Sequence, residues 1–453
     1  MKCKDMVLKD KRVLVVGLAR TGVSVAKFLR CKGAHVIITD LKPSNELTSF
    51  MDELRGLDIE FQLGGHEIDT FKRVDSIVVS PGVPLDIMPI KEAQKNSIEI
   101  MGEVELAYRF INTPIIAVTG TNGKTTTTAI ISEMLKASGY KVYVGGNIGS
   151  PLIDYASSSQ DKDYVVAEIS SFQLDGIRTF RPKIGLLLNI TEDHLDRYPG
   201  LLDYAQSKSR IFMNQTPEDV AILNKDDPLV MEIGKAVPGK RIYFSTRQEL
   251  QEGTYIRGKY IVFKNGQGGE ELFDITKLKI IGTHNHENVM SAILTTKLCK
   301  CAHESIVRTL EAFQGLEHRL EFVRTLNGVT FYNDSKGTNV GSVIKSLGSF
   351  THPIILIAGG KDKGGDFSLL RELVKEKVKL LILLGEAKEK ISRSLRDLVP
   401  DIMVHSLEEA VKVAYNLAKS GDIVLFSPAC SSFDMFQDYK ERGDVFKKAV
   451  RDL

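Results

Sequence analysis

Short runs of β-branched and other apolar residues alternate with helical patterns along most of this chain. Such alternation is typical of parallel sheets, in which a helix joins each strand to the next. The runs fall into three sets, which begin near residues 12, 115 and 329. A different texture lies between Arg241 and Phe273, where short strands surround a Lys-Asn-Gly-Gln-Gly-Gly turn, and this pattern indicates a β-meander.

The sequence therefore predicts an α/β protein of three domains. Residues 1–102 are expected to form a Rossmann-like domain, and residues 317–453 a second one. Residues 103–316 are expected to form a central domain of the phosphate-loop type with the small meander attached. A chain of 453 residues is long enough for three such domains with buried cores.

Composition excludes several classes of protein. With 43% hydrophobic residues, 26% charged residues and a net charge of +2, the chain gives no electrostatic reason to expect nucleic acid. No run approaches the ~18 apolar residues of a membrane span, and the amino terminus lacks the apolar core of a secretion signal. The five cysteines are scattered, which favours reduced thiols. We therefore expect a cytoplasmic protein that binds neither membrane nor nucleic acid.

The segment Gly120–Thr125, Gly-Thr-Asn-Gly-Lys-Thr, lies between a strand pattern and a helix pattern. The standard phosphate loop has a further glycine where this chain has Val118. Free backbone N–H groups and the positive end of the helix would still face an anion there, with Lys124 neutralising phosphate and the Thr125 hydroxyl available to Mg²⁺. The plain alternative is a threonine-capped helix with a solvated lysine. The strand–loop–helix context favours phosphate binding.

A second glycine loop, Gly17–Gly22, follows the first strand, and Asp40 ends the next one. This resembles the dinucleotide fingerprint, but Ala19 replaces its middle glycine, so the loop is weak support for a nicotinamide cofactor. Helix–strand packing explains the glycines more simply, and another nucleotide stays open. The turn at residues 80–84 also lies at a strand end, where such folds bind ligands.

Four polar side chains follow strands of the middle set: Asn147, Glu168, His194 and Lys208. Each has an ordinary explanation alone, but together with Thr125 they could frame a divalent metal site beside a phosphate. A lysine is cationic and therefore a poor metal ligand. The residues alone do not explain Lys208.

Ten motifs in one order resemble the Mur ligases, from residue 17 to residue 443. They are GTNGKT, GGNIG, EISSFQL, NITEDHLDRY, SKSRIF, GTHNHEN, HRLEF, NDSKGTN, GGKDKGGDF and SPACSSFDMF. The central motifs are shared with folylpolyglutamate synthetase. The last three are most similar to the family branch that adds D-glutamate.

The resemblance implies an ATP-dependent amide ligase that adds D-glutamate to UDP-N-acetylmuramoyl-L-alanine through an acyl phosphate, in cytoplasmic peptidoglycan synthesis. It implies ATP, two Mg²⁺ ions (Mn²⁺ being an alternative), a carbamylated lysine and a monomer. The alternatives are a related ligase with another amino acid or acceptor, such as a folate, a regulatory module without catalysis, and a nicotinamide oxidoreductase. Ala19 counts against the last of these.

The resemblance also implies a role for each matching position. Those for ATP are Gly120, Thr121, Asn122, Gly123, Lys124, Thr125, Thr126, Asn288, Arg319 and Asp334. Those for the UDP substrate are Arg20, Thr21, Asp40, Leu41, Lys42, Ser80, Gly82, Asn147 and His194. Those for D-glutamate are Thr338, Lys363, Ser432, Phe433 and Tyr439. The metal ligands are Thr125, Glu168, His194 and Lys208 as a carbamate, and the catalytic residues are Lys124, His194, Lys208 and Lys336. A carbamate turns the lysine into an oxygen ligand.

Overall fold

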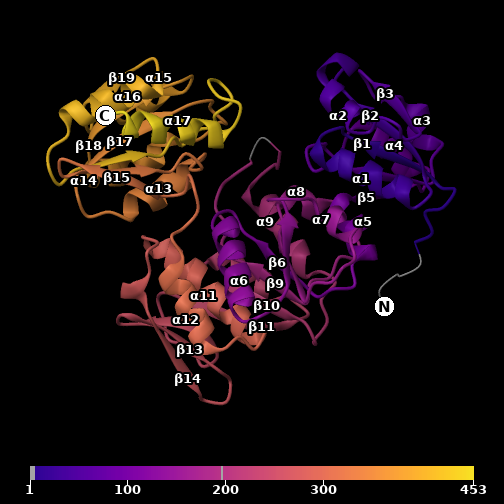
Figure 1. The fold of residues 1–453 in the computed structure, drawn as a ribbon, viewed down its shortest axis with the longest axis horizontal. Helices are drawn as coiled ribbons and strands as arrows, with labels where there is room; N and C mark the ends of the chain where they lie inside the picture. The colour runs from indigo at the N-terminus through magenta and orange to yellow at the C-terminus, as the bar shows by residue number, and fades with distance from the viewer. Residues whose placement is uncertain (1–5, 195–196) are drawn as a thin grey trace.

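The computed structural model describes residues 6–194 and 197–453, in which three separate sheets follow one another along the chain (Figure 1). The sheets lie within residues 12–102, 115–274 and 321–426. Most strand pairs are parallel and most strands are joined by helices. The three-domain α/β architecture predicted from the sequence is confirmed. The boundaries after residues 102 and 316 stay predictions.

The first domain contains a five-stranded parallel sheet in the order β3-β2-β1-β4-β5. Alternate residues of β1 belong to two different hydrophobic clusters, which explains why a sheet covered on both faces has continuously apolar strands. Its elements are β1 (Arg12–Val16), α1 (Arg20–Cys31), β2 (His35–Asp40), η1 (Ser44–Glu46), α2 (Thr48–Asp52), β3 (Ile59–Leu63), α3 (Ile68–Lys72), β4 (Ser76–Val79), α4 (Met88–Lys95) and β5 (Glu99–Gly102).

The middle domain contains a nine-stranded sheet in the order β14-β13-β12-β11-β10-β9-β6-β8-β7. Its strands are β6 (Ile115–Thr119), β7 (Val142–Gly146), β8 (Tyr164–Glu168), β9 (Ile184–Leu187), β10 (Val220–Asn224), β11 (Lys240–Ser245), β12 (Gly253–Arg257), β13 (Tyr260–Lys264) and β14 (Glu270–Asp274). Its helices are α5 (Glu103–Phe110), α6 (Lys124–Ala137), α7 (Leu152–Ala156), α8 (Ser171–Asp175), α9 (Leu201–Ser209), η2 (Arg210–Phe212), α10 (Pro228–Gly234), η3 (Ile275–Lys277), α11 (Thr283–Leu298) and α12 (His303–Ala312).

The meander is shorter than the sequence pattern indicated. Antiparallel pairing joins only β12, β13 and β14, from Gly253 to Asp274. The strand at the start of the predicted meander, β11, instead pairs in parallel with both β10 and β12. It therefore extends the main sheet, and the meander is continuous with that sheet.

The last domain contains a six-stranded sheet in the order β15-β16-β20-β17-β18-β19, with only its edge strand β15 antiparallel. Its elements are β15 (Glu321–Leu326), β16 (Val329–Asn333), α13 (Val340–Gly348), β17 (Ile354–Gly359), η4 (Phe367–Leu370), α14 (Arg371–Lys377), β18 (Val378–Leu384), α15 (Lys388–Leu395), β19 (Asp401–Met403), α16 (Leu407–Leu417), β20 (Ile423–Phe426) and α17 (Tyr439–Arg451).

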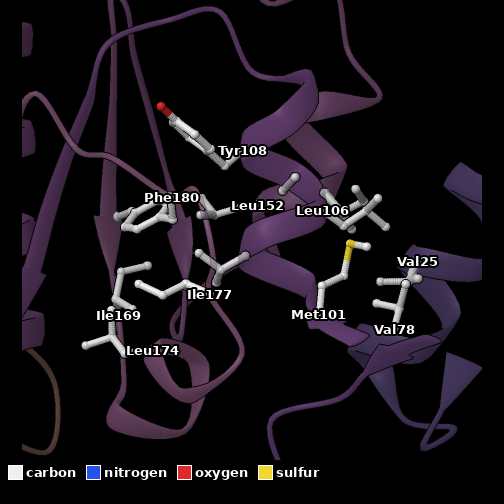
Figure 2. Packing of buried hydrophobic residues seen from close by; sticks show 14 of the residues in the cluster. Val25, Val78, Met101, Leu106, Tyr108, Leu152, Ile169, Leu174, Ile177 and Phe180 are labelled. Carbon is white, nitrogen blue, oxygen red and sulfur yellow. The ribbon is translucent and has the colours of Figure 1, made fainter. Parts of the chain in front are cut away.

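One hydrophobic cluster crosses from the first domain into the middle domain (Figure 2). Val78 and Met101 of the first sheet belong to it, together with Leu106 on α5 and Leu152 on α7. Because α5 directly follows β5, the link between these two domains is itself a buried helix. Burial of apolar surface therefore fixes the first domain against the middle one.

The last domain is joined to the rest differently. All buried members of its two hydrophobic clusters lie at or after Leu320, and Ile281 is the partly buried middle-domain residue that packs against them. Its described hydrogen bonds to the middle domain are polar contacts at the site. Interfaces of this kind permit relative domain motion, so closure of this domain is the movement we expect during turnover.

The carboxylate of Glu105 on α5 is fully buried and accepts five hydrogen bonds. The donors are the backbone N–H groups of Arg178, Thr179 and Phe180, the Thr179 hydroxyl and the Arg109 guanidinium. Burial alone raises the pKa of Glu105, but these bonds outweigh it and lower the pKa. The ionised carboxylate thus ties the linking helix to the loop before β9.

Glu105→Ala is expected to lower the free energy of unfolding by about 3–5 kcal/mol, because it leaves three backbone donors without an acceptor and removes one of the two carboxylates that pair with Arg109. Urea unfolding at pH 7 measures this, with Glu133→Ala on the exposed face of α6 as the matched control. The pKa of Glu105 is lower in the folded protein than in the unfolded chain. The stability that Glu105 contributes is therefore fully present above the unfolded-state pKa, and it is lost as the pH falls through the folded-state pKa. Equal urea midpoints for Glu105→Ala and Glu133→Ala would contradict a stabilising role for the hydrogen bonds to Glu105.

No helix within residues 6–194 and 197–453 is long and apolar enough to cross a membrane. Cys31, Cys299, Cys301 and Cys430 are free thiols, while Cys3 lies outside the described residues.

Candidate active site

The predicted phosphate loop and its neighbours meet at one edge of the middle sheet. β6, β7, β8 and β9 are parallel, so their carboxyl ends lie together. Gly120 follows β6, Asn147 follows β7, Glu168 ends β8 and Asn189 lies two residues beyond β9. Residues far apart in the sequence are thereby gathered around the N-terminus of α6.

Both glycines of the loop have backbone conformations that disfavour a side chain. Gly123 has φ +88° as the N-cap of α6, and Gly120 has φ +150°. A Cβ at Gly123 would lie 2.2 Å from Oδ1 of Asn288, and one at Gly120 would lie 3.0 Å from Cβ of Leu188. The chain can therefore pass closely between β9 and α11 only with glycine at these positions.

Asn189 fixes the shape of the loop. Its backbone carbonyl accepts a hydrogen bond from Thr121 N, and its side-chain oxygen accepts one from Asn122 N at 2.9 Å. Its amide nitrogen donates back to the Asn122 carbonyl at 3.1 Å. The loop is thus held from the end of β9 while the N–H groups at the start of α6 stay directed at the site.

Lys124, which is half-buried, and the buried Lys208 share one carbonyl of the loop. Nζ of Lys124 donates to Gly120 O at 2.9 Å and to Thr121 O at 3.0 Å, and Nζ of Lys208 donates to Gly120 O at 3.0 Å. Burial lowers the pKa of both ammonium groups, and the Lys124 charge lowers that of Lys208 further. Lys208 is 1% exposed and lies 4.4 Å from the centre of the Tyr204 ring. Burial therefore shifts Lys208 towards its neutral amine.

Glu168 carries a buried oxygen that no described group satisfies. Asn147 donates to Oε1 at 2.8 Å, but Oε2 has no hydrogen-bond partner among the described residues. An unsatisfied buried carboxylate oxygen is costly unless a ligand completes it. Oxygen donors suit Mg²⁺, and Glu168 together with the Thr125 hydroxyl supplies them.

Metal-binding side chains are otherwise few here. Residues 6–194 and 197–453 hold no group of three or more His, Cys, Asp and Glu side chains that could bind a metal. An unmodified Lys208 adds only a nitrogen donor. The donor set fits a hard cation through Glu168 and Thr125, and it would gain a further anionic oxygen if Lys208 were carbamylated.

A cavity of about 580 Å³ opens in front of the loop, and all three domains line it. Arg20 comes from the first domain, and Lys336 and Thr338 come from the last. Its other lining residues include Thr121, Asn122, Gly123, Lys124, Thr125, Asn147, Glu168, Asp193, Arg319, Asn339, Ser342, Tyr439 and Lys440.

Direct contacts join the last domain to the loop. Nζ of Lys336 lies 3.4 Å from both the Thr125 hydroxyl oxygen and the Tyr439 hydroxyl oxygen. The Ser342 hydroxyl donates to the side-chain oxygen of Asn122 at 3.1 Å. Beside them, the Asn339 amide donates to the Asp193 carboxylate at 3.1 Å. The start of α13 is therefore docked on the loop.

Three residues predicted for ATP, at its adenine, γ-phosphate and ribose, lie around a neighbouring pocket. Asn288, Arg319 and Asp334 line it together with Asn122 and Gly123. Nε of Arg319 is buried without a partner among the described residues. Asp334 accepts from Ser346, Ser427 and Leu320 N, and burial outweighs these bonds and raises its pKa. The Asn288 side chain is hydrogen-bonded to Thr127 and Asn285. Asn288 and Asp334 are thus both hydrogen-bonded within the protein.

Most residues predicted for the UDP substrate lie in the first domain, and Asn147 and His194 lie in the middle domain. The Asp40 carboxylate accepts hydrogen bonds from Leu18 N at 2.7 Å and from Lys42 N at 2.9 Å. It therefore holds both the glycine loop after β1 and the turn after β2. The Ser80 hydroxyl donates to Gly17 O at 3.1 Å. Thr21 lies in the first turn of α1, and Leu41 is exposed. The backbone carbonyl of Gly82 accepts a hydrogen bond from the Arg197 side chain. Arg20 and Asn147 reach the three-domain cavity; their substrate roles stay predictions.

The residues predicted for D-glutamate are divided. Thr338 and Tyr439 line the cavity, whereas Lys363, Ser432 and Phe433 are not among its lining residues. Lys363 is exposed, Phe433 is 67% exposed and Ser432 is buried. A bridge between Lys361 and Ser431 ties together the two loops that carry these three residues. A role for them in this arrangement stays a prediction.

His194 and Thr126 also lie outside the lining of the cavity. The His194 ring packs 4.8 Å from Phe172 and 6.3 Å from Tyr204, measured between ring centres, and its backbone has φ +55°. Thr126 is buried, with an unpartnered hydroxyl among the described residues. The predicted roles of both residues, in metal binding and catalysis for the histidine and in ATP binding for the threonine, are untested by this geometry.

Lys336 gives the site a titration near neutrality. Burial lowers its pKa to about 8, with the Arg319 charge as the next cause. If the ammonium form holds anionic groups, kcat/KM for ATP should fall as pH rises through about 8. An arginine keeps its charge at higher pH, so in Lys336→Arg the fall in kcat/KM should occur at a more alkaline pH. If kcat/KM fell over the same pH range in the wild type and in Lys336→Arg, the titrating group would be another residue.

Several residues of this site were not assigned from the sequence. Asn189, Asp193, Asn339, Ser342 and Lys440 all hold the loop or line the cavity. Asn189 and Asp193 belong to the NITEDHLDRY motif, in which only His194 has a predicted role. Asn339 ends the NDSKGTN motif, in which other residues were assigned. Local sequence carries no signal for Ser342 or Lys440, because their contribution depends on how the last domain docks.

Comparisons with known families match three consecutive parts of the chain. Residues 11–102 match "Mur ligase MurD-like, N-terminal domain", residues 118–296 match "Mur ligase middle domain", and residues 318–430 match "Mur ligase, glutamate ligase domain". Each matched range contains most of one sheet.

Full-length relatives are also found. A UDP-N-acetylmuramoylalanine–D-glutamate ligase of Geotalea daltonii is 52% identical over 448 residues, covering 99% of each chain. Among solved structures, a pseudomurein peptide ligase type C from Methanothermus fervidus aligns with TM-score 0.63 and 19% identity, covering 97% of this chain and 100% of that one. A MurF ligase from Thermotoga maritima in complex with ADP aligns with TM-score 0.61 and 15% identity over 99% of each. This chain therefore belongs to the Mur ligase family of ATP-dependent ligases.

Proposed function

We propose that the protein joins D-glutamate to UDP-N-acetylmuramoyl-L-alanine at the expense of ATP, in cytoplasmic peptidoglycan synthesis. The observation that carries the proposal is the three-domain cavity, in which a nucleotide loop, an unsatisfied carboxylate and cations of the first and last domains converge. The 52% identity to a named D-glutamate ligase favours this acceptor and amino acid over a folate or another amino acid.

In the first step, a carboxylate oxygen of the UDP substrate attacks the γ-phosphorus of ATP. The bond from that phosphorus to the bridging oxygen breaks, which gives an acyl phosphate and ADP. Lys124 and the N–H groups at the start of α6 would hold the transferring phosphoryl group in line. Arg319, whose Nε has no partner among the described residues, would stabilise the charge that spreads over the phosphoryl oxygens.

Bound Mg²⁺ would neutralise phosphate charge and polarise the phosphoryl oxygens. Glu168 and the Thr125 hydroxyl would hold it, with His194 as a further proposed ligand. Lys208 would contribute as a carbamate, since a neutral amine is the form that reacts with CO₂ and burial favours that form here. Two Mg²⁺ ions, or Mn²⁺ in their place, are part of this proposal.

In the second step, the amine of D-glutamate attacks the carbonyl carbon of the acyl phosphate, and phosphate leaves with loss of a proton from the amine. Lys336 lies between Thr125 and Tyr439, where it would stabilise the developing charge. Thr338 and Tyr439 would position the amino acid. We further propose that the enzyme works as a monomer, because one chain supplies all three walls of the cavity.

Isotope transfer tests this reaction. UDP-N-acetylmuramoyl-L-alanine carrying ¹⁸O in its terminal carboxylate is turned over with ATP, Mg²⁺ and D-glutamate, and the phosphate released is examined by mass spectrometry. An acyl phosphate requires one ¹⁸O in each phosphate, because the carboxylate oxygen leaves with the phosphorus. Unlabelled phosphate would refute carboxylate activation even if ATP were consumed.

A further inference from the structure

The wall of the cavity formed by α17 carries a cation that neither the motifs nor the proposed reaction assigns. Lys440 is the second residue of this helix and lines the same cavity as Lys124, Lys336 and Tyr439. Its charge is one of the causes that lower the pKa of Lys336, so the two ammonium groups face a shared space.

Lys440 is poorly compensated by the protein itself. Among the described residues, no ion pair or side-chain hydrogen bond involves its ammonium group. The two carboxylates nearest in the chain are used elsewhere: Asp438 caps the helix by accepting from Lys440 N and Glu441 N, and Glu441 accepts from Gln437 N. A lysine in the first turn of a helix is also opposed by the helix dipole. An anionic ligand would remove both disadvantages.

The order of groups across the cavity indicates which anion this is. The Thr125 hydroxyl marks the phosphate end, and Nζ of Lys336 lies 3.4 Å from it. Nζ of Lys336 lies equally 3.4 Å from the Tyr439 hydroxyl on α17, and Lys440 follows Tyr439. Lys440 is exposed and lines the cavity from the α17 side, next to the tyrosine that Lys336 contacts.

We propose that Lys440 binds the side-chain carboxylate of the incoming D-glutamate and so contributes to the choice of amino acid. The attacking amine must reach the acyl phosphate near Lys336, and the α-carboxylate is bonded to the same carbon as that amine. The side-chain carboxylate lies farther along the molecule, which suits a cation on α17, on the side of Lys336 that contacts Tyr439. This inference rests on the proposed ligase function.

The test compares Lys440→Met, which removes the charge but keeps the bulk, with Lys440→Arg, which keeps the charge. Lys448→Met is the matched control, because Lys448 is an exposed lysine of the same helix outside the cavity lining. Steady-state kinetics are measured for D-glutamate, ATP and UDP-N-acetylmuramoyl-L-alanine, and kcat/KM for D-glutamate is compared with that for D-glutamine.

Lys440→Met should raise KM for D-glutamate about 10-fold, the effect of losing one hydrogen bond to a charged group, with kcat within about twofold. The preference for D-glutamate over D-glutamine should fall by a similar factor, and Lys440→Arg should retain most of it. An unchanged KM for D-glutamate, or a change confined to ATP, overturns the inference. A wild-type enzyme without turnover on D-glutamate instead refutes the proposed function before any variant is compared.

Discussion

Lys124→Ala is expected to lower kcat by about 10²–10³-fold or more while binding of UDP-N-acetylmuramoyl-L-alanine stays close to wild type. Lys124 begins α6, and its ammonium group is held on the carbonyls of Gly120 and Thr121, where it can turn to a phosphate bound by the same loop. Removing it takes away the one lysine of the loop that neutralises the transferring phosphoryl group. Most of the residues predicted for the UDP substrate lie in the first domain, which this change does not touch.

The measurement is phosphate release at saturating substrates, together with calorimetric titration of the UDP substrate. Lys136→Ala is the control, because Lys136 lies on the same helix but is exposed and paired with Glu133. Normal turnover in Lys124→Ala would mean that the loop is not the ATP site. Loss of UDP-substrate binding would mean that the substitution disturbs the first two domains together.

Lys208→Ala is expected to be nearly inactive and to recover part of its activity when short carboxylic acids such as formate or acetate are added. Lys208 is buried beside Gly120 and Tyr204, and its neutral amine is the form that carbamylation requires. Truncation leaves space in the position of the side chain, and a small carboxylate placed there would restore the oxygen ligand. The expected rescue saturates with acid concentration.

Lys124→Ala provides the control for this rescue. This variant lacks a cationic group, and an added carboxylate cannot replace a cation. Chloride at equal ionic strength controls for salt. Failure of every short acid to restore activity in a folded Lys208→Ala protein would argue against a carbamate. Direct mass measurement of the wild-type protein under CO₂ gives an independent reading, since the carbamate adds a carboxyl group to one lysine.

The alternation of strands and helices was enough to predict the fold because each apolar run is covered on both faces. In β6, Ile115 and Ala117 belong to one hydrophobic cluster and Ile116 and Val118 to another, so no polar residue interrupts the strand. The same parallel geometry brought the strand ends together, as predicted. β11 was misplaced because a short strand with mixed exposure does not reveal the direction of its partners.

The site was only partly predictable for a different reason. Loop glycines and Glu168 carry local signals, namely a strand–loop–helix junction and a carboxylate ending an apolar strand. Asn339 and Ser342 meet Asp193 and Asn122 only when the last domain docks, and no pattern within either segment encodes that contact. The resemblance to a family supplied roles for Lys363 and its neighbours, but a motif does not specify which way a side chain points.

The most direct test of the central claim is phosphate release by the purified protein with ATP, Mg²⁺ and UDP-N-acetylmuramoyl-L-alanine in parallel reactions containing D-glutamate, L-glutamate, L-lysine or meso-diaminopimelate. The account predicts turnover with D-glutamate and background release with the other three. Release with another amino acid in place of D-glutamate would leave the ATP loop and the ligase chemistry standing and contradict the substrate. Background release in all four reactions would contradict the proposed function itself.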